Sequence, residues 1–155
     1  MTVAAAPYDT EELAHQAFGK LDPNQYGVLP VLVIIQNDTD QALKLDRVEV
    51  EYTTADGRHL DATPAADVQT LGGADRPSVR PPTSIPLPRK RKSPLNVWEI
   101  EGHSFAAKMI PPHESASGFF YFQTSYQRGA KFYLTGMKEA STGKDILYFE
   151  FPLGK

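Results

Sequence analysis

The run Val-Leu-Pro-Val-Leu-Val-Ile-Ile-Gln at residues 28–36 is the clearest indicator of the fold in this sequence. Its apolar side chains occupy both alternating phases, so both faces of a strand formed here must be covered by the rest of the chain. Pro30 has no N–H to donate and therefore belongs near the start of the strand. The polar residues 37–40 that follow are typical of a turn. We therefore expect a central β-strand over 28–36.

The residues after this strand continue the β pattern. Residues 43–52 alternate between apolar and charged side chains, as a half-buried antiparallel strand does, but their leucines lie on the opposite phase. This predicts a bulge or bend near Asp46. Asp56-Gly57 is a strong hairpin signal, and residues 58–63 form the returning strand. Four more strands are expected in the second half, at 105–109, 119–122, 132–137 and 146–151.

No helical segment separates these strands, which favours an all-β sandwich over a βαβ arrangement. Residues 8–21 are the best helix candidate, with Asp9 or Thr10 as N-cap and Gly19 at the C-terminal end. We expect an N-terminal extension with a short helix at 1–27. A single β-sandwich domain at 28–155 follows it, with about seven antiparallel strands.

Residues 64–96 match neither a strand nor a long helix. They hold seven of the 13 prolines, and they contain no aromatic residue with which to build a core of their own. Residues 65–71 can form a helical turn or two, and beyond them we expect extended, polyproline-like chain. Loops this long inside a compact domain are uncommon and are usually functional or disordered.

A run of four basic residues, Arg89, Lys90, Arg91 and Lys92, gives this loop a strong positive charge. Residues 75–92 contain six positive and one negative side chain, a net +5, in a chain whose total is −3. The run is a candidate for binding an acidic protein or an anionic envelope surface. Two alternatives remain open: a solvated loop, or a charge that pairs with the protein's own acidic surface.

Trp98 follows the basic run, between Val97 and Ile100. An exposed tryptophan beside a basic segment would be a recognition hot spot, whereas a tryptophan among apolar neighbours is more often part of a core. Together with Arg89–Lys92, it completes the set of candidate partner-binding residues.

Composition excludes several kinds of chemistry. The chain has no cysteine, so disulfides, thiolate catalysis and cysteine-bound metals are excluded, and its net charge of −3 argues against a general nucleic-acid binder. The four histidines lack metal-ligand spacing, and no motif for nucleophilic catalysis or nucleotide binding is present. We therefore expect no catalytic residues, cofactor or metal.

The run from Val31 to Thr39, the Asp56-Gly57 turn and the segment from Ile110 to Phe122 resemble a known family. They are similar to small immunoglobulin-like (telokin-like) β-sandwich accessory domains of bacterial secreted proteins and lipoproteins. The resemblance covers about residues 28–63 and 104–151 and implies an immunoglobulin-like fold, an extracytoplasmic setting and a binding or structural role. The family shares no catalytic residues.

The expected function is thus a non-enzymatic interaction or structural module. The alternatives are an envelope-associated hydrolase or carbohydrate-binding accessory domain, and self-assembly through the C-terminal strand at 146–151 as a sheet edge. Residues 1–7 have neither a basic region nor an apolar core of a signal peptide. We expect a secreted or periplasmic protein whose signal peptide has been removed, with a cytoplasmic location as the alternative.

Overall fold

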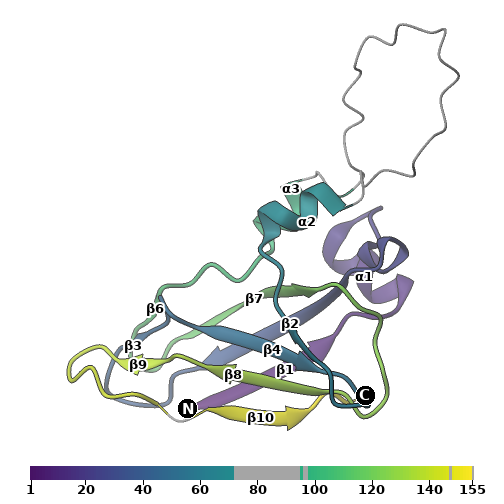
Figure 1. The fold of residues 1–155 in the computed structure, drawn as a ribbon. Helices are drawn as coiled ribbons and strands as arrows, with labels where there is room; N and C mark the ends of the chain where they lie inside the picture. The colour runs from purple at the N-terminus through teal and green to yellow at the C-terminus, as the bar shows by residue number, and fades with distance from the viewer. Residues whose placement is uncertain (72–94, 96–97, 147, 155) are drawn as a thin grey trace, which may run out of the picture.

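The computed structural model describes residues 1–71, 95, 98–146 and 148–154. Within these residues the chain is mostly β, with ten strands in three antiparallel sheets and three short α-helices (Figure 1). The predicted β-rich class is confirmed, but the strands are shorter and more numerous than the seven expected. The basic run Arg89–Lys92 lies outside the described residues.

The first sheet has the order β1-β2-β7. Its strands are β1 (Thr2–Pro7), β2 (Leu29–Gln36) and β7 (Ser115–Phe122). β2 lies between the other two, and one of its faces is fully buried in the main core. The opposite face is covered only toward the start of the strand, and Ile34 is 42% exposed, so the expectation of two covered faces is wrong for the second half of β2. β1 was not expected: residues 2–7 pair with β2 along their whole length, because Val3 and Ala5 supply inward-facing apolar side chains.

The second sheet has the order β10-β8-β4-β5. Its strands are β4 (Glu49–Thr53), β5 (His59–Asp61), β8 (Lys131–Thr135) and β10 (Phe149–Pro152). Val50 and Tyr52 are buried, while Glu49 and Glu51, which alternate with them, face outward, and this confirms the predicted alternation. The predicted hairpin turns at Gly57, whose φ of 88° suits glycine.

A third, small sheet has the order β6-β3-β9 and is formed by β3 (Leu43–Lys44), β6 (Met109–Ile110) and β9 (Lys138–Glu139). The chain passes from β3 to β4 in the second sheet, so the bend predicted near Asp46 divides the expected strand in two. The strand expected at 105–109 is mostly wrong, since only Met109 belongs to β6. Its first residue, Phe105, stacks on Phe120 of β7 instead, with ring centroids 5.2 Å apart.

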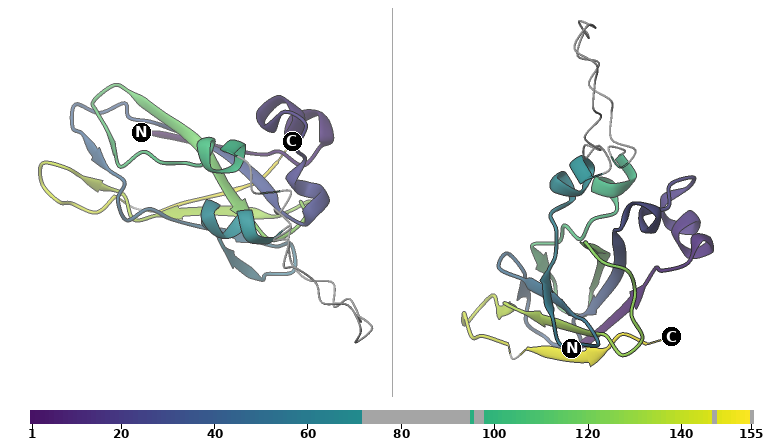
Figure 2. Two further views of the ribbon diagram at one scale, coloured as in Figure 1. Left: turned by 90° about the horizontal axis from the view of Figure 1, so that it is seen from above. Right: turned by 45° about the vertical axis from the view of Figure 1, so that its right-hand side comes forward.

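The main core lies between the first and second sheets, whose arrangement can be followed in Figure 2. Burial of these side chains is the dominant favourable contribution to folding. Both long sheets contribute fully buried residues, and the small sheet closes one end with Leu43 and Ile110. The buried set from the long sheets is Leu29, Val31, Val33, Ile35, Tyr52, Phe122, Phe132 and Leu134.

One fully buried amide joins two loops at the end of this core. The Asn37 side-chain nitrogen donates to the carbonyl oxygens of Gln41 at 2.7 Å, Pro111 at 3.0 Å and Ile110 at 3.2 Å. Its oxygen accepts from the backbone N–H and the hydroxyl of Thr39. The turn predicted after β2 is therefore bonded to the loop between β6 and β7.

Three helices and one 3-10 turn complete the described chain. The predicted first helix is present but shorter, as α1 (Glu11–Phe18), with Thr10 accepting from the N–H of Leu13 and Gly19 at its end. The 3-10 turn is η1 (Pro23–Tyr26). The helical turns expected at 65–71 form α2 (Ala65–Leu71), and α3 (Trp98–Gly102) was not predicted.

Candidate functional site

The helices form a cap over one end of the first sheet (Figures 1 and 2). Beneath them lies a second buried cluster, on the face of β2 and β7 opposite the main core. Every α-helix contributes to it, as do β7, Val28 just before β2, and Leu95. We call this set the cap cluster: Phe18, Val28, Val68, Leu95, Ile100, Phe119 and Tyr121.

Tyr121 connects the cap to the sheet. Its hydroxyl donates to the Ile100 carbonyl oxygen of α3 at 2.6 Å, and its ring lies in the cap cluster. Burial raises the pKa of the Tyr121 phenol far above its ordinary value, so this hydroxyl remains a donor throughout the physiological range. Because Ile100 is itself fully buried, α3 is held at both its side chain and its backbone.

Trp98 begins α3 and points away from this cluster. Its side chain is 70% exposed, which contradicts the interpretation of Trp98 as a core residue. The indole lies against the His103 ring, with centroids 5.8 Å apart and an angle of 33° between the planes. A Cβ at Gly102 would lie 2.8 Å from the indole, so the glycine permits this close approach. An exposed tryptophan is therefore held on an anchored helix.

Of the five candidate residues from the sequence, the structure places Trp98 alone. Arg89–Lys92 lie outside the described residues, so their position relative to the indole is not assigned. The described surface near Trp98 carries acidic groups on α3, Glu99 and Glu101, and Gln69 of α2 donates to the latter at 3.3 Å. The surface charge of α3 is thus opposite in sign to that of the basic run.

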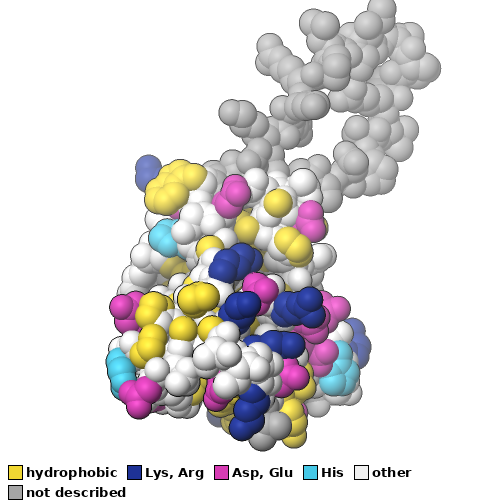
Figure 3. Space-filling view, turned by 90° about the vertical axis from the view of Figure 1, so that its left-hand side faces the viewer, with side chains coloured by type: hydrophobic (Ala, Val, Ile, Leu, Met, Phe, Trp, Pro, Cys, Tyr) yellow, Lys and Arg dark blue, Asp and Glu magenta, His cyan; other side chains and the backbone are white. Residues whose placement is uncertain are grey.

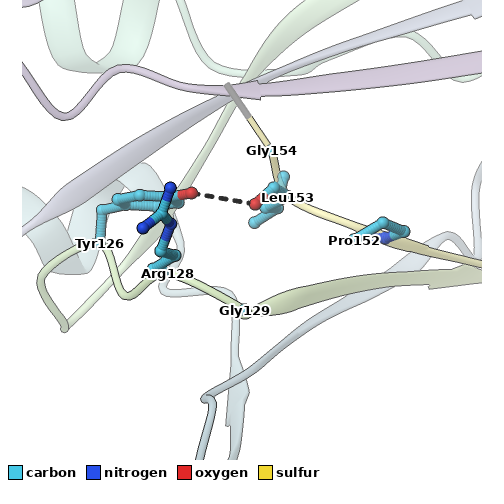
Figure 4. Close-up of a pocket in the computed structure, with 6 residues that line it drawn as sticks. All are labelled: Tyr126, Arg128, Gly129, Pro152, Leu153 and Gly154. Carbon is cyan, nitrogen blue, oxygen red and sulfur yellow. Dashed lines mark hydrogen bonds between the residues drawn. The ribbon is translucent and has the colours of Figure 1, made fainter.

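A surface hollow of about 390 Å³ lies elsewhere, where the loop after β7 meets the end of β10 (Figure 4). Tyr126 donates to the Leu153 carbonyl oxygen at 3.1 Å across it, and Arg128 brings the charged side chain of the lining. No sequence signal indicates this hollow, because its lining residues come from two segments that are distant in the chain.

Charged side chains also meet at the small sheet. Figure 3 shows Lys and Arg side chains gathered, with acidic ones among them, on the face of the molecule at this end. Lys44 lies directly opposite Lys138 across the strand pair, and Lys138 forms an ion pair with Asp145 at 3.3 Å. No sequence signal indicated this pair, since the lysines are far apart in the chain.

The histidines do not assemble a metal centre in the described part of the chain, where no three His, Asp or Glu side chains are grouped to hold an ion. His59 is hydrogen-bonded to Glu51 on the outer face of the second sheet, and His113 to Asp40 at 2.8 Å in an exposed turn. None of the described helices is both long enough and apolar enough to cross a membrane.

Comparisons with known proteins assign no family. No protein-family model matches the chain, and no curated protein does. One similar solved structure is titled as the X-ray structure of a Northeast Structural Genomics Consortium target, SoR45. It shares 18% identity at a TM-score of 0.34, with 82% of this chain and 66% of that chain covered.

Proposed function

We propose that this protein is a non-enzymatic interaction module whose binding surface is centred on Trp98. The observation that carries the proposal is the 70% exposure of this indole on a short helix that Ile100 fixes in a buried cluster. Tryptophan supplies more contact area than other side chains and is enriched at binding hot spots. An anchored helix also lowers the ordering cost of binding, because the indole is placed in advance.

The class of partner follows from charge. The four basic residues Arg89–Lys92 precede Trp98 in the chain, and the proposal is that one partner engages both the indole and this charge. An acidic protein surface is complementary to that charge and would be attracted at long range. The competing interpretation is that the basic run pairs with acidic groups of this chain, such as Glu99 and Glu101.

The proposal includes an immunoglobulin-like β-sandwich in an extracytoplasmic setting. Its support is the resemblance of residues 28–63 and 104–151 to accessory domains of secreted proteins, together with two antiparallel sheets that share one core. A binding role suits such a scaffold, because its rigid core holds loops and short helices at its ends.

The test is capture of partners from a bacterial cell-envelope extract by four baits. They are the unaltered chain, Trp98→Ala, a variant with Arg89–Lys92 changed to Ser, and Tyr148→Ala as a matched control. Tyr148 is an exposed aromatic residue too, at 60%, but it stacks on Tyr133 of the second sheet.

We expect an acidic protein that is captured by the unaltered chain and by Tyr148→Ala and lost from the other two baits. Equal capture by all four baits would contradict the proposal. If capture is lost with the Trp98→Ala bait alone, the indole is the binding site and the basic run does not contact the partner. The basic run would then be solvated or paired with the protein's own acidic surface.

A further inference from the structure

The outer edges of the sheets differ in what covers them. β7 is bonded on its outer edge, where the Phe105 N–H donates to the Phe119 carbonyl at 2.9 Å and the Thr63 N–H to the Tyr121 carbonyl at 2.7 Å. Thr63 follows β5, so this bond joins the chain just beyond the end of that strand to β7. β1 and β10 are the strands that end the two sheets on their other edges.

β10 is protected against pairing with another strand. The Leu153 N–H donates to the Ala130 carbonyl at 2.9 Å. The backbone N–H and C=O groups of the odd-numbered residues of β10 therefore point toward β8, and those of the even-numbered residues point away from the sheet. Those outward residues are Glu150, which is charged, and Pro152, which has no N–H. Charge and proline are the usual protections of a sheet edge. The C-terminal strand is therefore a poor candidate for the self-assembly edge expected from the sequence.

β1 also ends in an outward-facing proline, Pro7, but the strand before it lacks both charge and proline. The Tyr8 N–H donates to the Pro30 carbonyl at 2.9 Å, so the even-numbered residues of β1 bond to β2. The N–H and C=O groups of Val3 and Ala5 therefore face outward. Neither residue is charged, and no proline occurs before Pro7.

The side chains of β1 give the same indication. Val3 and Ala5 point into the main core but are only partly buried, whereas their partners on β2, Ile35 and Val33, are fully buried. The core is thus incompletely covered along this edge. A strand added beside β1 would bury these side chains and satisfy the outward backbone groups in one step.

We propose that β1 pairs antiparallel with β1 of a second copy of this chain. Placing Val3 opposite Ala5 of the other copy, and the reverse, forms four main-chain hydrogen bonds around a two-fold axis at Ala4. The two three-stranded sheets then join into one sheet of six strands. The pairing is self-complementary, which favours a second copy over an unrelated strand.

The outer face of the joined sheet suits this arrangement. In this register Ala4 lies directly opposite Ala4 of the other copy, where a small side chain allows the close approach of a non-hydrogen-bonded pair. The side chains on this face of the first sheet carry no charge that the second copy would repel: Thr2, Ala4, Ala6, Leu32, Ile34, Gln36, Ser115 and Ser117.

The test is sedimentation velocity of the full chain over a range of concentrations. We expect a monomer of 17.1 kDa to give way to twice that mass as concentration rises. Ala4→Glu or Ala4→Lys places like charges across the axis and should raise the dimer dissociation constant by about tenfold or more. An equimolar mixture of the two variants should restore dimers. Ser117→Glu, on the same face but two strands away, is the control.

A second pair of variants tests the edge directly. Ala5→Pro removes an outward N–H without touching a bond to β2, and Glu150→Pro makes the matched change on the edge of β10. We expect only Ala5→Pro to weaken the dimer. An unaltered chain that stays monomeric at all concentrations, or an Ala4→Glu and Ala4→Lys mixture no more dimeric than either alone, would overturn the proposal.

Discussion

Replacement of Asn37 by Ala should strongly destabilise the fold, although no core hydrophobe is lost. Asn37 is fully buried, and its amide nitrogen is shared by three carbonyl oxygens from two loops. The variant removes the amide donor from the buried Ile110 carbonyl, which faces Leu43 of β3 as well, and the loss of this hydrogen bond costs about 1–2 kcal/mol. The partly buried carbonyls of Gln41 and Pro111 add smaller amounts, so the total is about 2–4 kcal/mol.

The assay is urea denaturation at neutral pH, with Gln36→Ala as the matched control. Gln36 precedes Asn37 on the outer, half-buried face of β2, and we expect its loss to change the free energy of unfolding by less than about 0.5 kcal/mol. A change of similar size for Asn37→Ala would refute the reasoning that this amide joins the two loops.

Asn37→Asp extends the same test to pH. A carboxylate at this buried position would face carbonyl oxygens, so its pKa should be raised above the ordinary value of about 3.9. The folded state then binds the proton more tightly than the unfolded state. The stability of this variant should therefore fall as pH rises above about 4, relative to that of the unaltered chain.

Three further predictions concern single positions. Gly136→Ala should lower the free energy of unfolding by about 3 kcal/mol or more, because φ is 87° and a Cβ would lie 2.0 Å from a backbone carbonyl oxygen. Gly143→Ala is the control: φ is 69° there but the space is open, so the cost should be about 1–2 kcal/mol. Urea denaturation measures both. By the same measurement, Ile100→Ala should cost about 3 kcal/mol because Ile100 is buried, and Trp98→Ala less than about 0.5 kcal/mol because Trp98 is exposed. Equal losses of stability in the two variants would show that the indole has a structural role. Tyr121→Phe should lower the free energy of unfolding by about 1–2 kcal/mol, because it removes the bond to Ile100. The raised pKa of the Tyr121 phenol stabilises the fold only below pH ~10, so stability should fall less steeply above that pH in the variant than in the unaltered chain. Unfolding free energies measured from pH 8 to 11 check both effects.

The strands that sequence predicted best are those with a strong apolar pattern. β2 and β4 have clear phases, and the Asp56-Gly57 turn has a specific backbone preference, so all three were located correctly. The bend near Asp46 was visible as a change of phase. Its consequence, a move from one sheet to another, depends on contacts between distant segments and was not predictable.

The largest omission was β1. Thr-Val-Ala-Ala-Ala-Pro has little apolar bulk and weak strand propensity, so its pairing with β2 is a tertiary effect. The error at 105–109 has the opposite origin. That segment has an alternating apolar pattern, but the segment does not pair with a neighbouring strand along its whole length. Phe105 at its start packs on β7.

For the candidate site, sequence identified Trp98 but not its environment. A tryptophan between two apolar residues is compatible with either burial or exposure, and the choice depends on which face of α3 meets the cap cluster. Ile100 occupies that face, which leaves the indole outside. The free edge of β1 could not be recognised from sequence either, since it follows from the order of strands.

The most direct test of the proposed function uses Trp98 itself, because it is the only tryptophan in the chain. Its emission is recorded while the full chain is titrated with polyglutamate as an acidic protein probe, in low and in high salt. We expect a blue shift and weaker quenching by acrylamide as the indole leaves water. Both effects should be lost in high salt and in the variant with Arg89–Lys92 changed to Ser. Binding of polyglutamate that leaves the emission unchanged, or no binding at low salt, would contradict the proposed function.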